Sequence, residues 1–209
     1  CAGGFMLFPC QSSVFHGRLA SPMARALMAA ATLVVVTTAW ASLKSSTRFT
    51  LADLERAPEM TPRQFANLFE NFRFSYRPYV QPVEIFLRDQ DGDCDDYAIL
   101  ADHVLSRKGC HTRIVRVTLA GSDVSHAVCY VSENKAYLDY NNRKYSVNLE
   151  RSGSTIREIA SKVADSFEKN WTSATEYTFS YENYRKVTRF TVVKTDPPER
   201  DPDRQGGRR

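Results

Sequence analysis

The chain has 209 residues, of which 43% are hydrophobic and 25% charged, and a formal net charge of +4. This composition predicts a globular chain that is long enough to bury a sizeable core. The positive excess is scattered and partly confined to the C-terminal end, so it gives no reason to expect a nucleic-acid partner. The sequence contains no internal repeat and no Walker, Rossmann or paired CxxC pattern. It therefore gives no reason to expect a nucleotide-binding site or a zinc site of these kinds.

Residues 1–41 have the pattern of a leader and not of a folded domain. Arg25 precedes a short apolar stretch over residues 26–36, and Ala39-Trp40-Ala41 is a small-x-small cleavage site. The apolar stretch is shorter than the roughly 18 residues of a spanning helix. We therefore expect an export signal that is removed before Ser42, no stable membrane insertion afterwards, and a periplasmic or secreted protein. The alternative is an uncleaved N-terminal anchor.

Residues 42–195 are expected to form one monomeric domain, and residues 196–209 a disordered tail rich in Pro, Gly and Arg. Helices come first in the domain. One is predicted to begin at Thr61-Pro62, where a capping residue precedes proline. A short helix is predicted over residues 83–88, and a longer one begins at Cys94 and reaches about Lys108.

Segments rich in β-branched and aromatic residues follow the helices and predict antiparallel strands. They lie at residues 112–119, 125–131, 136–140, 145–149, 175–181 and 186–194. One more helix among them opens with the capping box Thr155-Ile156-Arg157-Glu158. Helices first and antiparallel strands afterwards predict an α+β fold, with the Cys94 helix packed on an antiparallel sheet.

An acidic turn runs directly into the helix that begins at Cys94. Asp93 is a good N-cap, which places Cys94 in the first turn, and apolar residues follow at three- and four-residue steps. The unpaired N–H groups and the macrodipole of a helix N-terminus favour an anion, so a thiol there is biased toward thiolate. A free cysteine is usually a small buried hydrophobe, so a nucleophile also requires a base.

His126 is the candidate base for the Cys94 thiol. The other three histidines of the chain lie in the leader or in and just after the Cys94 helix. A hairpin centred between Glu133 and Asn134 would place Asp139 diagonally across from His126, about 7–8 Å away at Cα. A shift of one residue in this register would put the two side chains on opposite faces of the sheet, so the pairing is a specific prediction.

The sequence resembles the transglutaminase-like superfamily in three motifs, and it is most similar to the bacterial transglutaminase-like cysteine proteinases. The motifs are Asp91-Gly92-Asp93-Cys94-Asp95-Asp96-Tyr97-Ala98, His126-Ala127-Val128 and Tyr137-Leu138-Asp139, within roughly residues 60–150. The resemblance implies a papain-like core with Cys94 as nucleophile, His126 as base and Asp139 as its orienter. It also implies acyl transfer or amide hydrolysis on a protein or peptide. Two departures are Val128, where many transglutaminases carry an aromatic residue, and the unusually acidic turn.

Further groups complete the predicted site. The backbone N–H of Cys94 is an oxyanion donor, and the Gln90 amide is a second candidate for that role. Asp95 and Asp96 are interpreted as complements to the helix N-terminus. The acidic turn begins like an EF-hand loop, but Cys94 occupies the position that needs glycine, so that motif fails. No cofactor and no metal ligand is therefore predicted, with calcium as the alternative because related bacterial proteinases can use it.

Three functions fit these residues. The favoured one is thiol-dependent hydrolysis of peptide or isopeptide amides through a thioester on Cys94. The second is acyl transfer to an amine through the same thioester, and the third is a non-catalytic binding module on the same fold. The complete set of Cys94, His126 and Asp139 argues against the third. Cys110 and Cys129 are expected to be core thiols, because the predicted register separates them by about 13 Å along the strands.

Overall fold

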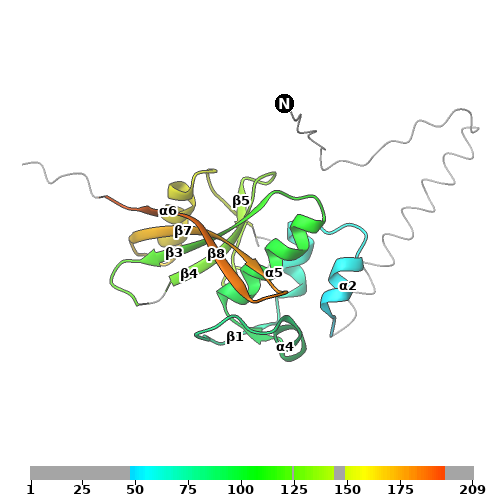
Figure 1. The fold of residues 1–209 in the computed structure, drawn as a ribbon. Helices are drawn as coiled ribbons and strands as arrows, with labels where there is room; N and C mark the ends of the chain where they lie inside the picture. Colours follow the sequence, from blue (N-terminus) through cyan, green and yellow to red (C-terminus); the bar gives the residue numbers. More distant parts are fainter. Residues whose placement is uncertain (1–47, 124, 144–148, 196–209) are drawn as a thin grey trace, which may run out of the picture.

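The computed structural model describes residues 48–123, 125–143 and 149–195. Within these ranges the helices come first and a six-stranded sheet follows, with one helix inserted before the last two strands (Figure 1). The predicted α+β class is confirmed. The predicted leader over residues 1–41, the tail over residues 196–209 and most of the strand predicted at residues 145–149 lie outside the described residues.

Most of the described helices begin with a capping box. A threonine or aspartate N-cap accepts an N–H from the first turn, and a side chain of that turn accepts the N-cap N–H in return. This capping box begins α2 (Leu51–Arg56), α3 (Pro62–Leu68), α5 (Cys94–Arg107) and α6 (Ile156–Ser166), while α4 (Val83–Asp89) has no side-chain cap. The predicted caps Thr61, Asp93 and Thr155 are confirmed, and α2 was not predicted.

The sheet is antiparallel throughout, in the order β6-β5-β4-β3-β7-β8. Its strands are β3 (Thr112–Leu119), β4 (Ser125–Val131), β5 (Ala136–Leu138), β6 (Leu149–Arg151), β7 (Trp171–Ser180) and β8 (Arg185–Val193). The bounds of β3 and β4 are those predicted, and β7 begins four residues earlier than expected. β5 ends two residues earlier, because Asp139 begins a turn in which its Oδ1 accepts the N–H of Asn141 at 2.8 Å.

The predicted strand registers are also confirmed. Cys129 in β4 lies opposite Ile114 of β3 and opposite Leu138 of β5. Asp139 follows Leu138 directly, so it continues the chain at the level of Val128. His126 and Asp139 therefore come to the same side of the sheet, as the diagonal pairing requires.

Each face of the sheet supports its own hydrophobic core. On one face, alternate residues of β3, β4 and β5 pack with α2 to α5, and Phe65, Tyr97 and Ala98 are completely or almost completely buried there. On the other face, the intervening residues pack with α6, chiefly through Ile159 and Val163. Figure 1 shows α5 on the side of the sheet that also carries α2 and α4. None of the helices in the described ranges combines the length and the apolar composition that a membrane span requires.

A short parallel pairing, which the sequence did not predict, leads the chain into α5. β1 (Arg73–Phe74) pairs with β2 (Asp91–Gly92), and β2 is followed at once by the N-cap of α5. The pairing is close because position 92 has no side chain: a Cβ there would lie 2.5 Å from the Phe86 ring and 2.7 Å from Asp96 Oδ2. The segment that follows β1 is thereby held beside Cys94.

Candidate active site

Cys94 is the first residue of α5, where the sequence predicted it. Asp93 caps the helix, and its Oδ1 accepts the N–H groups of Asp95 at 3.0 Å and Asp96 at 3.4 Å. An N–H at the first helical position has no acceptor within the helix. The Cys94 N–H can therefore bind an anion beside its own sulfur atom.

His126 is held between Asp139 and Cys94. Its Nε2 lies 2.9 Å from Asp139 Oδ1, and its ring is also hydrogen-bonded to the Cys94 side chain. Because Asp139 occupies Nε2, Nδ1 is the ring nitrogen that remains to face the sulfur atom. Both His126 and Asp139 are buried, at 4% and 1% exposure, so water competes little for this interaction.

These contacts change the protonation of His126. Burial, the largest single influence, disfavours the charged imidazolium. The charge and hydrogen bond of Asp139, followed by those of Cys94, outweigh burial and raise the pKa of His126 to about 10. The raised pKa favours the imidazolium, the form that places a positive charge next to the sulfur of Cys94.

The turn after Asp139 is anchored by Arg143, a residue that the sequence analysis did not single out. The Arg143 guanidinium is buried, lies 3.9 Å over the Tyr140 ring, and donates to the backbone carbonyls of Phe69, Phe72 and Tyr140. It thus ties the turn that carries Asp139 to the segment between α3 and β1. A lone arginine in a polar turn carries no pattern from which this role could be predicted.

The acidic residues on either side of Cys94 have partners that account for their charges. Asp91 accepts from Ser75 Oγ at 2.6 Å and pairs with Arg77. Asp96 accepts both the backbone N–H and the side-chain amide of Gln81, each at 2.8 Å, in addition to the N–H of Asp93. Asp96 therefore complements the helix N-terminus, as expected.

Asp95 also lies in the first turn of α5, as expected, and it has additional partners on the sheet. Its carboxylate pairs with Arg116 of β3 and accepts the hydroxyl of Tyr177 of β7 at 2.7 Å. These contacts bind the first turn of α5 to the sheet. The residue that follows Cys94 thus fixes the position of the sulfur relative to the strand that carries His126.

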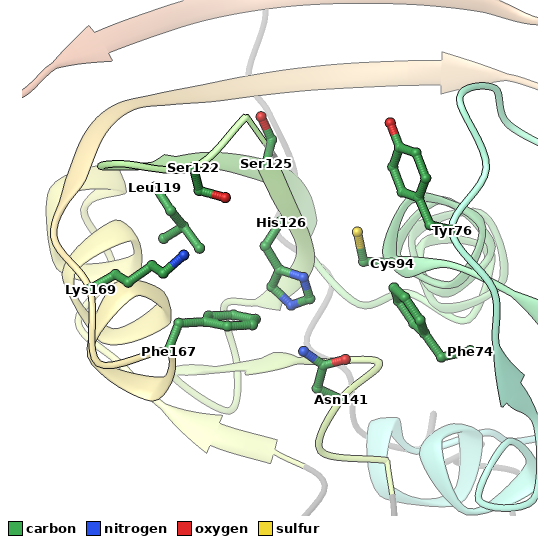
Figure 2. Close-up of a pocket in the computed structure, with 10 residues that line it drawn as sticks. All are labelled: Phe74, Tyr76, Cys94, Leu119, Ser122, Ser125, His126, Asn141, Phe167 and Lys169. Carbon is green, nitrogen blue, oxygen red and sulfur yellow. The ribbon is translucent and has the colours of Figure 1, made fainter.

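Cys94 and His126 lie in the wall of a cavity of about 240 Å³. Figure 2 shows Phe74 and Tyr76 on the Cys94 side, and Leu119, Phe167 and Lys169 on the far side of His126. The Phe167 ring meets the imidazole edge to face, with the ring centroids 4.8 Å apart. The remaining lining residues are Ser122, Ser125 and Asn141. A chain that crosses this cavity would pass directly over the thiol and the imidazole.

Gln90, the second predicted oxyanion donor, does not line this cavity. It ends α4 in the left-handed conformation, with φ 52°, and its carbonyl accepts the N–H of Arg73 at 2.8 Å. The role of the Gln90 amide as an oxyanion donor stays a prediction. Neither Cys110 nor Cys129 takes part in a disulfide, and no disulfide occurs within the described ranges.

A family model described as a transglutaminase-like domain matches residues 50–158, just over half of the chain. The chain therefore belongs to the transglutaminase-like domain family, and its α+β structure is the papain-like fold of that superfamily. None of the curated proteins gives a significant match.

Among solved structures, the chain is similar to Legionella pneumophila LapG. The calcium-bound form is 16% identical, covers 66% of this chain and 82% of its own, and gives a TM-score of 0.41. The EGTA-treated form is 14% identical, covers 74% and 90%, and gives a TM-score of 0.42.

Proposed function

We propose that this protein is a cysteine hydrolase that cleaves peptide or isopeptide amides through a thioester on Cys94. One observation carries the proposal. Buried His126 is hydrogen-bonded to both Asp139 and Cys94 in the wall of a cavity, and these contacts raise its pKa. A thiol at a helix N-terminus, a histidine beside it and a group that orients the histidine are the parts that thiol catalysis requires.

The first half of the reaction forms the acyl-enzyme. The Cys94 thiolate attacks the carbonyl carbon of the scissile amide, and the Cys94 N–H stabilises the oxygen that becomes negative. The C–N bond then breaks as the His126 imidazolium gives its proton to the leaving nitrogen. The products of this half are an amine, a thioester on Cys94 and a neutral His126.

In the second half, neutral His126 removes a proton from a water molecule that attacks the thioester carbonyl. The C–S bond breaks, the acyl group leaves as a carboxylic acid, and the thiolate–imidazolium pair is restored. An amine in place of this water would give acyl transfer through the same thioester. Peptide hydrolysis and transfer are therefore distinguished by the product, a free acid or a new amide.

Calcium remains the alternative cofactor for the acidic turn next to Cys94. No group of three or more potential metal-binding side chains gathers in the described ranges, and the carboxylates of the acidic turn are committed to protein donors. The mechanism above uses no metal ion. The proposed substrate is a protein or peptide, and the proposed place of action is outside the cytoplasm, on the basis of the predicted signal at residues 1–41.

Labelling with iodoacetamide between pH 5 and 8, followed by peptide mass mapping, tests the activated thiol. We expect Cys94 to react at pH 6 much faster than free glutathione, because the imidazolium favours the thiolate. His126→Gln should bring its rate down to that of an ordinary thiol. In parallel, the protein is incubated with a defined peptide mixture, with and without an added primary amine, and the products are identified by mass. Cys94 labelling at the ordinary rate together with no cleavage or transfer would leave the binding-module function.

A further inference from the structure

Lys169 is the one lysine or arginine among the residues that line the cavity. Figure 2 shows its side chain extended along the far side of His126, with the ammonium group near Leu119. No hydrogen bond or ion pair of this ammonium is found with any residue in the described ranges. The mechanism proposed above does not use the positive charge of Lys169.

The backbone holds Lys169 in a defined place. At the end of α6, the Lys169 N–H donates to the Ala164 carbonyl and the Glu168 N–H to the Asp165 carbonyl, both at 3.0 Å. These are the two bonds of a Schellman turn, in which glycine usually takes the left-handed position. Here Glu168 occupies the left-handed position, with φ 54°. This backbone conformation is energetically unfavourable for a residue other than glycine.

The proposed reaction determines which half of the substrate lies on each side of the cavity. The leaving nitrogen must reach the proton of His126, whereas the carbonyl carbon must reach the sulfur of Cys94. The part of the substrate that leaves as the amine therefore extends past His126. Leu119, Phe167 and Lys169 lie on that side, and Phe74 and Tyr76 lie on the other.

We infer that Lys169 is a specificity-determining residue that binds a carboxylate on the leaving-group half of the substrate. This inference rests on the hydrolase function proposed above. The carboxylate is either an acidic side chain or the free C-terminus of a short leaving group. The apolar surfaces of Leu119 and Phe167 lower the local polarity, which strengthens a charge pair at their edge. Since Lys169 itself is exposed, we expect a preference on the order of threefold to tenfold in kcat/KM.

The test uses the full protein and matched peptides derived from a sequence that it cleaves. Glu, Gln or Lys is placed at each of the first two positions after the scissile bond, in long peptides with amidated ends. A second set has short leaving groups with a free or an amidated C-terminus. Values of kcat and KM are measured separately, and we expect the carboxylate to lower KM in at least one set. The set that shows the effect identifies the source of the carboxylate.

Four variants connect the preference to Lys169. Lys169→Met should abolish it and change kcat/KM far more for the Glu peptides than for the Gln peptides. Lys169→Arg should keep the preference, and Lys169→Glu should favour the Lys peptides. Lys162→Met is the matched control, because Lys162 is an exposed lysine of α6 outside the cavity lining. If Lys169→Glu does not fold, the comparison of Lys169→Met with wild type decides.

The outcomes separate the two proposals. Cleavage without any charge preference, or a preference that persists in Lys169→Met, would overturn the role of Lys169 and leave the hydrolase function in place. If the wild-type protein cleaves no peptide and forms no acyl-enzyme, the hydrolase function fails and the specificity role fails with it.

Discussion

The chemistry of single residues at this site depends on one buried imidazole. His126 has Asp139 on one ring nitrogen and Cys94 toward the other, so each neighbour helps to keep it charged. Burial works against that charge and is the largest single influence on its pKa. The proposed reactivity of Cys94 therefore depends on a balance, and substitutions of the three residues should have graded effects.

Cys94→Ala should abolish turnover and leave the fold intact, since it removes one small side chain at a helix start. His126→Ala should lose nearly as much, roughly a thousandfold or more, because the thiolate loses its neighbouring cation. Asp139→Asn should lose less, on the order of tenfold to a hundredfold, since an amide oxygen can still accept from the imidazole. Steady-state kinetics on a cleaved peptide measure this order, and circular dichroism confirms folding. Amide cleavage that survives Cys94→Ala would remove the thiol mechanism.

The raised pKa of His126 predicts the alkaline limit of activity. The imidazolium is the proposed proton donor to the leaving nitrogen, so kcat/KM should fall as the pH rises through about 10, the pKa of His126. Asp139→Asn should move this limit to lower pH, because the carboxylate is the main influence that opposes burial. A pH–rate profile for both proteins tests the shift. An alkaline limit that is the same in both would separate Asp139 from the titration of His126.

The same pKa has a consequence for folding stability. It is raised from 6.5 in the unfolded chain to about 10 in the fold, so the interaction stabilises the fold fully below pH about 6.5. This contribution is lost as the pH rises through 10. The difference in melting temperature between wild type and His126→Gln should accordingly shrink between pH 6 and pH 10.

At the scale of elements, the site is assembled by contacts between segments that are distant in sequence. Asp95 binds α5 to β3 and β7, and Arg143 binds the turn after β5 to the segment before β1. Both are charged groups that connect an element of the proposed site to a rigid neighbour. Their loss should move the site without removing a reacting atom.

Arg143→Met should therefore destabilise the protein by about 3 kcal/mol, because it leaves three backbone carbonyls without their donor in a buried place. It should also lower kcat, since the turn that holds Asp139 loses its anchor. Urea unfolding measures the first effect and peptide kinetics the second. Arg56→Met is the control, because Arg56 is an exposed residue whose partner Asp53 lies within the same helix turn. Equal effects of the two substitutions would contradict the anchoring role.

At the scale of the whole molecule, the described part of the chain has a six-stranded sheet with helices on each face and the short β1–β2 pairing beside α5. The proposed site lies where α5 meets β4. The proposed place of action depends instead on residues 1–41. If Ala39-Trp40-Ala41 is cleaved, the mature protein should begin at Ser42 and occur outside the cytoplasm. N-terminal sequencing of the protein from its native host, with cell fractionation, measures both. A retained Arg25 would support the uncleaved anchor.

Much of this molecule was predictable because the determinants are local. Thr61, Asp93 and Thr155 begin helices through hydrogen bonds to residues three positions away, so a short stretch of sequence contains the whole signal. The hairpin between β4 and β5 is also short, and its centre determines the register that aligns Asp139 with His126.

The sequence alone therefore determined the fold class, the registers of the β3–β4 and β4–β5 hairpins and the three residues proposed for catalysis. Only the tertiary structure revealed the partner of Asp95, the burial of Arg143, the β1–β2 pairing and the cavity wall that includes Phe167 and Lys169. These features join segments far apart in the chain. The free energies of these contacts depend on the desolvation and geometry of the assembled core. No periodicity or spacing within one segment therefore predicts them.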